Sequence, residues 1–178
     1  IECDNLSAST LKSIRNSLPH AQIKNSSNLI LLIRMVKSTE ELKRLRCAGQ
    51  IAEEAATRVL SDARPGKFSR EMVGEFRSHV AKEGADLDHF AICARGLGLA
   101  TEANVTLLED DILYTDYGCV FEHYCSDSGQ TLALCNLDSE DRQCYEALRD
   151  CVATGAESAS TGAKSSRIAA TMSDLLNF

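Results

Sequence analysis

The sequence lacks a long hydrophobic run. No uninterrupted apolar stretch is longer than Leu29–Ile33, which is far too short to cross a bilayer. The N-terminus also lacks the charged start and the apolar core of a secretory signal peptide. These absences disfavour a membrane protein and a secreted protein, so we expect a cytoplasmic location.

A surplus of positive charge is also absent. The chain of 178 residues has 19 Lys and Arg against 26 Asp and Glu, a net charge of −7, and the basic residues are scattered among acidic ones. This pattern argues against a nucleic-acid-binding surface. The apolar fraction of 44% and the charged fraction of 25% are typical of a soluble globular protein. The length suits one domain, alone or with a piece of another.

Cysteine pairs in the Cys-x-x-Cys spacing are missing too, although the chain has eight cysteines. A chain of this length can bury a core without disulfides. We therefore expect reduced thiols that are mostly buried.

Among the features that are present, a β-hairpin organises the rest. Two β-rich runs within Ile112–Leu134 surround a short polar break, a pattern that predicts two antiparallel strands. If the turn is centred between Phe121 and Glu122, Asp116 and Asp127 stand directly opposite each other, with Cβ atoms about 4.5 to 5.5 Å apart. The turn has no Asn-Gly or Asp-Gly pair that would fix this register.

On such a hairpin the two aspartates need a positive partner. Facing carboxylates repel each other, and removing charge from water without a partner costs free energy. Hard divalent cations bind carboxylate oxygens, and two such ions can share bridging carboxylates. Asp116 and Asp127 are therefore predicted metal ligands, and the alternative is a pair of solvent-facing aspartates near a turn. A zinc site of Cys119, His123 and Cys125 is disfavoured, because Cys119 points to the opposite face of this hairpin.

Helical periodicity precedes the hairpin. Ser38 and Glu41 form a capping box ahead of one helix, and Ser69 begins a second helix that reaches Val80. The predicted buried face of the first helix comprises Leu42, Leu45, Ala48, Ala52, Ala55, Ala56 and Val59. The chain then continues into a short strand, Phe90–Cys93, and an irregular loop over residues 95–106.

The same order of cap, helix, glycine turn and helix recurs from Asp138 to Leu176. The predicted apolar face of its first helix comprises Cys144, Tyr145, Leu148, Cys151 and Val152. No strands follow this second copy. A duplicated unit of two helices and a curved sheet pairs its halves about a pseudo-two-fold axis, with a site between them. The repeat therefore indicates half of such a fold together with the helices of the other half.

The motifs in this order resemble a known family. They are Arg34–Glu41, Arg64–Gly66, Asp116–Gly118, and Tyr124–Asp127 followed by Gly129–Thr131. The chain resembles the pita-bread-fold metallopeptidases of the aminopeptidase P, Xaa-Pro dipeptidase and creatinase-like type. The resemblance implies an α+β fold with helices on a curved antiparallel sheet. Residues 35–178 would form an incomplete catalytic-type domain with a truncated second half, and residues 1–34 the C-terminal remnant of an N-terminal domain.

The resemblance also implies a dinuclear metal site. In this family two divalent ions, Mn, Co or Zn, are held by two aspartates, matched here by Asp116 and Asp127, and by a histidine and two glutamates from later strands that have no positions here. Residues 1–178 alone are therefore expected to be inactive. Two departures accompany this: Gly98–Ala100 stands where the family usually has a histidine, and Gln130 stands where it commonly has an arginine.

The leading functional hypothesis is a metal-dependent hydrolase that cleaves peptide bonds next to proline with a metal-activated water. A homodimer is also expected. One alternative is a non-catalytic peptide-binding relative, favoured by the two departures, and another is an amidinohydrolase-type enzyme acting on C–N bonds. No catalytic residue beyond the ligands is assigned. His89, just before a strand, is predicted to contact substrate, whereas His20 and His79 are predicted to be surface residues.

Overall fold

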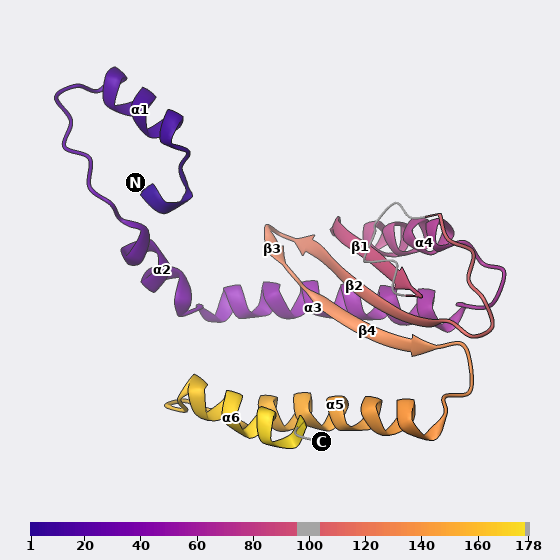
Figure 1. Ribbon diagram of the computed structural model, residues 1–178. Coiled ribbons are helices and arrows are strands. Elements are labelled where there is room, and N and C mark those ends of the chain that lie inside the picture. Colours follow the sequence, from indigo (N-terminus) through magenta and orange to yellow (C-terminus); the bar gives the residue numbers. More distant parts are fainter. Residues whose placement is uncertain (96–103, 177–178) are drawn as a thin grey trace. The chain divides into compact units, whose positions relative to one another are not determined.

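The computed structural model describes residues 1–95 and 104–176. Most of the predicted loop at residues 95–106, the Gly98–Ala100 stretch included, lies outside the described residues. Within the described part no helix combines the length and the hydropathy that crossing a membrane requires. The elements in order (Figure 1) are a 3₁₀ turn at Cys3–Asn5, α1 at Ala8–Ser17, α2 at Ser27–Met35, α3 at Thr39–Ser61, α4 at Ser69–Lys82, β1 at Asp86–Ala94, β2 at Ile112–Phe121, β3 at Tyr124–Cys125, β4 at Ser128–Ala133, α5 at Ser139–Ser158 and α6 at Ser165–Leu176.

The chain divides into two compact units. The first comprises Ile1–Thr57, Phe76–His89 and Tyr117–Ser128, and the second comprises Arg58–Glu75, Phe90–Asp116 and Gly129–Phe178. Strands β1 and β2 each contribute residues to both units. In the sheet, β2 lies between β1 and β3 and also pairs with β4.

The hairpin turn is tighter than predicted and lies one residue later. Strands β2 and β3 are antiparallel, with Val120 opposite Cys125 and Phe121 opposite Tyr124. Between them only Glu122 and His123 form the loop, and their φ angles of 46° and 71° are both in the left-handed region. Two such residues are the requirement of a type I′ turn, whose twist matches that of antiparallel strands.

The register of this turn continues along the hairpin. The Ser126 N–H donates to the Cys119 carbonyl at 2.9 Å, and the Leu134 N–H donates to the Asp111 carbonyl at 2.9 Å. Moving a turn by one residue shifts each cross-strand pairing by two. The predicted centre of the turn is therefore wrong, although the hairpin itself is present.

The direct pairing of Asp116 with Asp127 is consequently wrong as well. In the observed register Asp116 lies opposite Gly129, and Asp127 lies opposite Gly118, so the two aspartates are diagonal neighbours. A shift of two residues keeps every side chain on its original face of the sheet, because side chains alternate with a period of two. The carboxylates therefore still share one face, as the sequence predicts.

Helices α3 and α4 supply the core of the first unit. Tyr117 lies with its ring centroid 5.8 Å from that of Phe76, and the Cys119 thiol donates to the Ala48 carbonyl at 3.2 Å. Small alanine side chains on α3 let β2 approach the helix this closely. Leu42, predicted to belong to the same buried face, is instead 40% exposed. The buried side chains of this core include Ala48, Ala52, Ala55, Ala56, Phe76, Val80, Tyr117 and Cys119.

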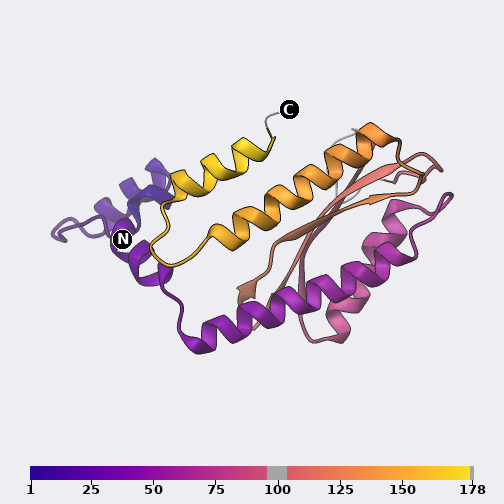
Figure 2. The ribbon, with the colours of Figure 1, turned by 90° about the horizontal axis from the view of Figure 1, so that it is seen from below.

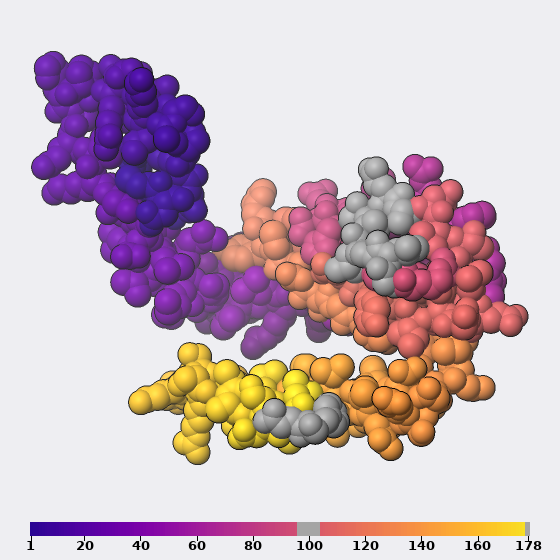
Figure 3. All heavy atoms as spheres, viewed as in Figure 1, coloured from indigo at the N-terminus to yellow at the C-terminus, as the bar shows by residue number. Residues whose placement is uncertain are grey.

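In the second unit, α5 and α6 lie side by side (Figure 2), as the orange and yellow atoms of Figure 3 also show. Asp138 caps α5 by accepting from the Glu140 and Asp141 N–H groups, as predicted. A Cβ at Gly155 would lie 2.5 Å from the Met172 sulfur, so the Met172 side chain packs directly against the α5 backbone at this glycine. Much of the predicted apolar face of α5 is exposed, by 43% at Tyr145, 54% at Leu148 and 64% at Val152.

The capping box at the start of α3 is confirmed. The Ser38 N–H donates to Glu41 Oε2 at 2.7 Å, and the Glu41 N–H donates to Ser38 Oγ at 3.3 Å. The backbone hydrogen bond from Ser38 lowers the pKa of the Glu41 carboxyl, because it favours the charged form. This pair fixes the first turn of the helix that supports the sheet.

Replacing Ser38 by Ala should lower the free energy of unfolding by about 1 kcal/mol, because the cap loses its acceptor. The matched control is Ser78→Ala, an exposed serine inside α4, which should change it by less than about 0.5 kcal/mol. Urea denaturation followed by circular dichroism measures both. Equal effects of the two substitutions would contradict the role of the capping box.

Candidate metal centre

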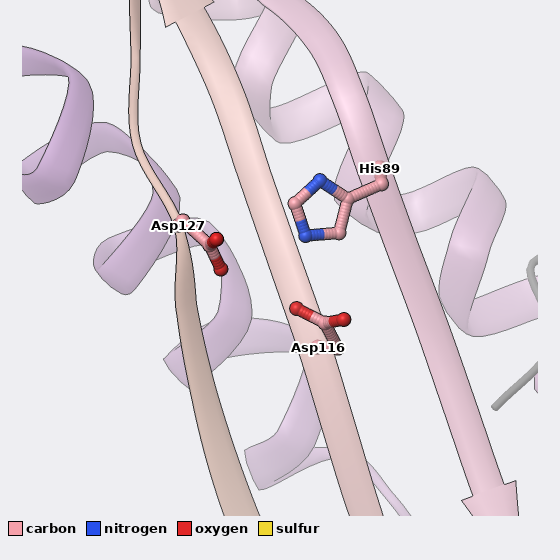
Figure 4. A group of neighbouring side chains, drawn as sticks. All are labelled: His89, Asp116 and Asp127. Atoms are coloured by element: carbon pink, nitrogen blue, oxygen red, sulfur yellow. The ribbon is translucent and has the colours of Figure 1, made fainter.

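Three side chains with metal-ligating atoms meet on the sheet. They are His89 of β1, Asp116 of β2 and Asp127, which immediately precedes β4 (Figure 4). One ligand atom from each lies within 4.8 Å of the other two. His89 and Asp116 are half-buried and Asp127 is exposed, so one side of the group is open to solvent.

His89 reaches this group because β1 is longer than predicted. The sequence predicts a short strand at Phe90–Cys93, whereas the strand begins at Asp86. His89 therefore lies within β1, next to β2 in the sheet, rather than in the approach to the strand. Its Nδ1 lies 3.0 Å from Asp88 Oδ2, and Figure 4 shows the other ring nitrogen directed toward the two aspartates.

Gly118 makes the close approach of these segments possible. A Cβ at this position would lie 2.2 Å from the Ser126 carbonyl oxygen and 2.9 Å from His89 Cε1. The backbone before Asp127 and the imidazole ring therefore both occupy space that any other residue would need. The glycine in the Asp116–Gly118 motif is thus a packing requirement of this group.

On the opposite face of the hairpin, Glu53 of α3 connects the two strands. The Tyr117 hydroxyl donates to Glu53 Oε2 at 3.1 Å, and the Ser128 hydroxyl donates to Glu53 Oε1 at 2.6 Å. Tyr117 and Ser128 directly follow Asp116 and Asp127 in the chain. The Glu53 carboxylate therefore connects the two backbone segments that carry the aspartates.

Sequence reasoning missed both Glu53 and Asp88. A signal for Glu53 exists, because this acidic residue interrupts the alanine-rich face of α3 between Ala52 and Ala55. A signal for Asp88 is its position directly before His89. The predicted strand began at Phe90, however, and left both residues outside it.

The donor set fits a divalent cation. Nitrogen and oxygen ligands lie about 2.0 to 2.2 Å from a transition metal such as zinc, so donors on one ion are at most about 4.4 Å apart. Atoms that already lie within 4.8 Å of one another reach this spacing with small side-chain rotations. Two carboxylates and one imidazole supply two negative charges and a nitrogen ligand, which suit Mn, Co or Zn.

Cys119, Cys125 and Gln130 are not part of this group. Cys119 is fully buried and Cys125 is exposed, in keeping with their predicted placement on opposite faces. Burial raises the pKa of the Cys119 thiol, which disfavours the thiolate that zinc requires. Gln130 is half-buried in β4, where its N–H donates to Thr115 Oγ1 at 3.2 Å.

Comparison with known proteins identifies related chains. Residues 43–177 match the model of metallopeptidase family M24. The uncharacterized peptidase YqhT of Bacillus subtilis is 27% identical over 159 residues, which cover 86% of this chain and 45% of that protein. The Xaa-Pro dipeptidase of Lactobacillus helveticus is 25% identical over 183 residues, which cover 99% of this chain and 50% of that protein. The chain thus spans about half the length of these curated relatives.

Solved structures show the same fold. The prolidase of Pyrococcus horikoshii superimposes with a TM-score of 0.88 at 19% identity, covering 97% of this chain and 51% of that one. The X-Pro aminopeptidase of Thermotoga maritima gives a TM-score of 0.79 at 18% identity, covering 86% of this chain and 45% of that one. The predicted α+β architecture, helices on an antiparallel sheet forming about half of a pita-bread fold, is confirmed.

Replacing Glu53 by Ala should lower the free energy of unfolding by about 1 to 3 kcal/mol, because two partly buried hydroxyls lose their acceptor. Glu53→Gln should cost less, since its amide oxygen still accepts one of these bonds. The control is Glu54→Ala, an exposed neighbour on α3, with an expected change below about 0.5 kcal/mol. Urea denaturation compares the three variants. If Glu53→Ala were as mild as the control, Glu53 would not hold the strands together.

Proposed function

The chain belongs to metallopeptidase family M24, and from this membership we propose that it forms part of a metal-dependent hydrolase that cleaves peptides next to proline. The observation that carries the proposal is the group of His89, Asp116 and Asp127, whose ligand atoms lie within 4.8 Å of one another. Relatives named Xaa-Pro dipeptidase and Xaa-Pro aminopeptidase support the choice of substrate.

In this proposal Asp116 and Asp127 hold the catalytic cation or pair of cations. A bound divalent metal supplies a water of lowered pKa as the nucleophile and polarises the scissile carbonyl. The aspartates contribute negative charge and fix the position of the metal on the hairpin. Glu53 and Gly118 keep the two strands in the register that this position requires. The open side next to the exposed Asp127 gives a peptide room to approach.

The remaining family properties stay predictions. These are two divalent ions of Mn, Co or Zn, a homodimer, a cytoplasmic location, and residues 1–34 as the remnant of a separate N-terminal domain. A non-catalytic peptide-binding relative is the second candidate. Gln130, in place of the usual arginine, and Gly98–Ala100, in place of the usual histidine, favour that alternative.

A thermal melt tests whether the aspartates bind a cation. Adding Mn²⁺ at about a hundred times its dissociation constant should stabilise the parent by about 2.7 kcal/mol, whereas Asp127→Asn should abolish the rise in Tm. Without metal, Asp127→Asn should be as stable as the parent or more stable by up to about 1 kcal/mol, because repulsion between two carboxylates is relieved. Asp174→Asn, at an exposed site on α6, is the control and should keep the metal-dependent rise. Equal rises in all three proteins would remove the cation site.

Peptide hydrolysis tests the reaction itself. A protein that carries this chain together with a later histidine and two glutamates should release products from Xaa-Pro peptides only with Mn²⁺ or Co²⁺, and Asp127→Asn should abolish turnover. Residues 1–178 alone should show no measurable cleavage, because three of the five expected ligands are not among them. Binding of proline peptides without turnover by the longer protein would favour the non-catalytic alternative.

A further inference from the structure

His89 lies close enough to Asp116 and Asp127 to bind the same metal ion, whereas a residue that only contacts substrate would lie farther from them. We infer that His89 supplies, through Nε2, a third protein ligand to the cation held by Asp116 and Asp127. The inference rests on the proposed function, because it assumes the cation that the two aspartates bind. It changes the predicted role of His89 from contact with substrate to contact with the metal.

The first support is the distance between the groups. An imidazole nitrogen of His89 lies within 4.8 Å of a carboxylate oxygen of Asp116 and of Asp127, and those two oxygens also lie within 4.8 Å of each other. A cation bound by both carboxylates therefore lies within reach of this nitrogen. A histidine so close to the ion can complete its coordination more readily than it can reach past the ion to a peptide.

The second support is the partner of the other ring nitrogen. Asp88 Oδ2 lies 3.0 Å from His89 Nδ1, so Nδ1–H can donate to this carboxylate while Nε2 is directed toward the aspartates (Figure 4). Metal-binding histidines nearly always donate their second ring N–H to a carboxylate, a carbonyl or water. This bond fixes the tautomer with a lone pair on Nε2 and makes that nitrogen a stronger ligand.

The third support is the close packing of the His89 imidazole against Gly118. His89 Cε1 lies 2.9 Å from the position of a Cβ on Gly118, so the imidazole lies directly over the backbone of β2. Gly118 is two residues from Asp116 on the same face of the strand and opposite Asp127 in the observed register. The glycine therefore leaves the space in which the ring lies close to both carboxylates (Figure 4).

An imidazole ligand has a consequence for the choice of metal. Carboxylate and water ligands suit Mg²⁺ and Ca²⁺, whereas imidazole favours later divalent ions such as Zn²⁺ and Co²⁺. With His89 as a ligand, the purified protein should prefer Co²⁺ and Zn²⁺ to Mg²⁺. Without it, much of that preference should be lost.

The experiment is a titration of the purified protein with Co²⁺, followed by calorimetry and by the visible absorption of the bound ion. His89→Gln should weaken Co²⁺ binding roughly tenfold or more, and Asp88→Asn by about 10- to 100-fold, the usual effect of losing a partner behind a ligand. Asp127→Asn should abolish binding. His20→Gln, at an exposed position in the N-terminal segment, is the control and should bind as the parent does.

Proton NMR of the Co²⁺-loaded protein adds a readout that a purely structural role would not change. A metal-bound imidazole should give a strongly shifted, solvent-exchangeable N–H signal, which His89→Gln should remove and His20→Gln should keep. Unchanged affinity and an unchanged signal in His89→Gln, with binding still abolished in Asp127→Asn, would overturn the inference and leave the proposed cation site standing. Failure of the parent to bind Co²⁺ would overturn both.

Discussion

The register of the β2 hairpin is the constraint on which the candidate site depends. It is set by a loop of only two residues, Glu122 and His123, both in the left-handed region, and backbone hydrogen bonds carry it to Leu134. A shift by a single residue would send one strand's side chains to the other face. Asp116 and Asp127 would then lie on opposite sides of the sheet, and no cation could bridge them.

The two faces of the hairpin have different roles: one packs against α3, and the other carries the candidate metal ligands. One face presents Tyr117 and Ser128 to Glu53 of α3, so a single carboxylate accepts a hydrogen bond from each strand. The other face presents Asp116 and Asp127, together with His89 from β1. Because side chains alternate along a strand, the packing on the first face fixes the positions of the candidate ligands on the second. The positions of the candidate ligands therefore depend on partly buried hydrogen bonds that involve no cation.

The sequence predicts the parts of this arrangement that depend on local pattern. The capping box of Ser38 and the sharing of one face by the two aspartates follow from short-range rules, and both hold in the structure. The exact register does not, because a turn without Asn-Gly or Asp-Gly leaves its centre open. Glu53 is visible in the sequence as an acidic residue in an alanine-rich helix face, but its hydrogen-bond partners are not. It joins residues more than sixty positions away in the chain, and no periodicity encodes such a contact.

The exposure of the apolar face of α5 could not be predicted for a different physical reason. Helical periodicity shows which side of α5 is apolar, but it does not show what covers that side, and Tyr145 and Leu148 remain exposed.

The most direct test of the account is X-ray diffraction from crystals soaked in Mn²⁺, with the ion located by its anomalous scattering. The account predicts a peak about 2.0 to 2.6 Å from carboxylate oxygens of both Asp116 and Asp127. Ordered carboxylates with no peak between them, or Mn²⁺ bound only elsewhere, would contradict it.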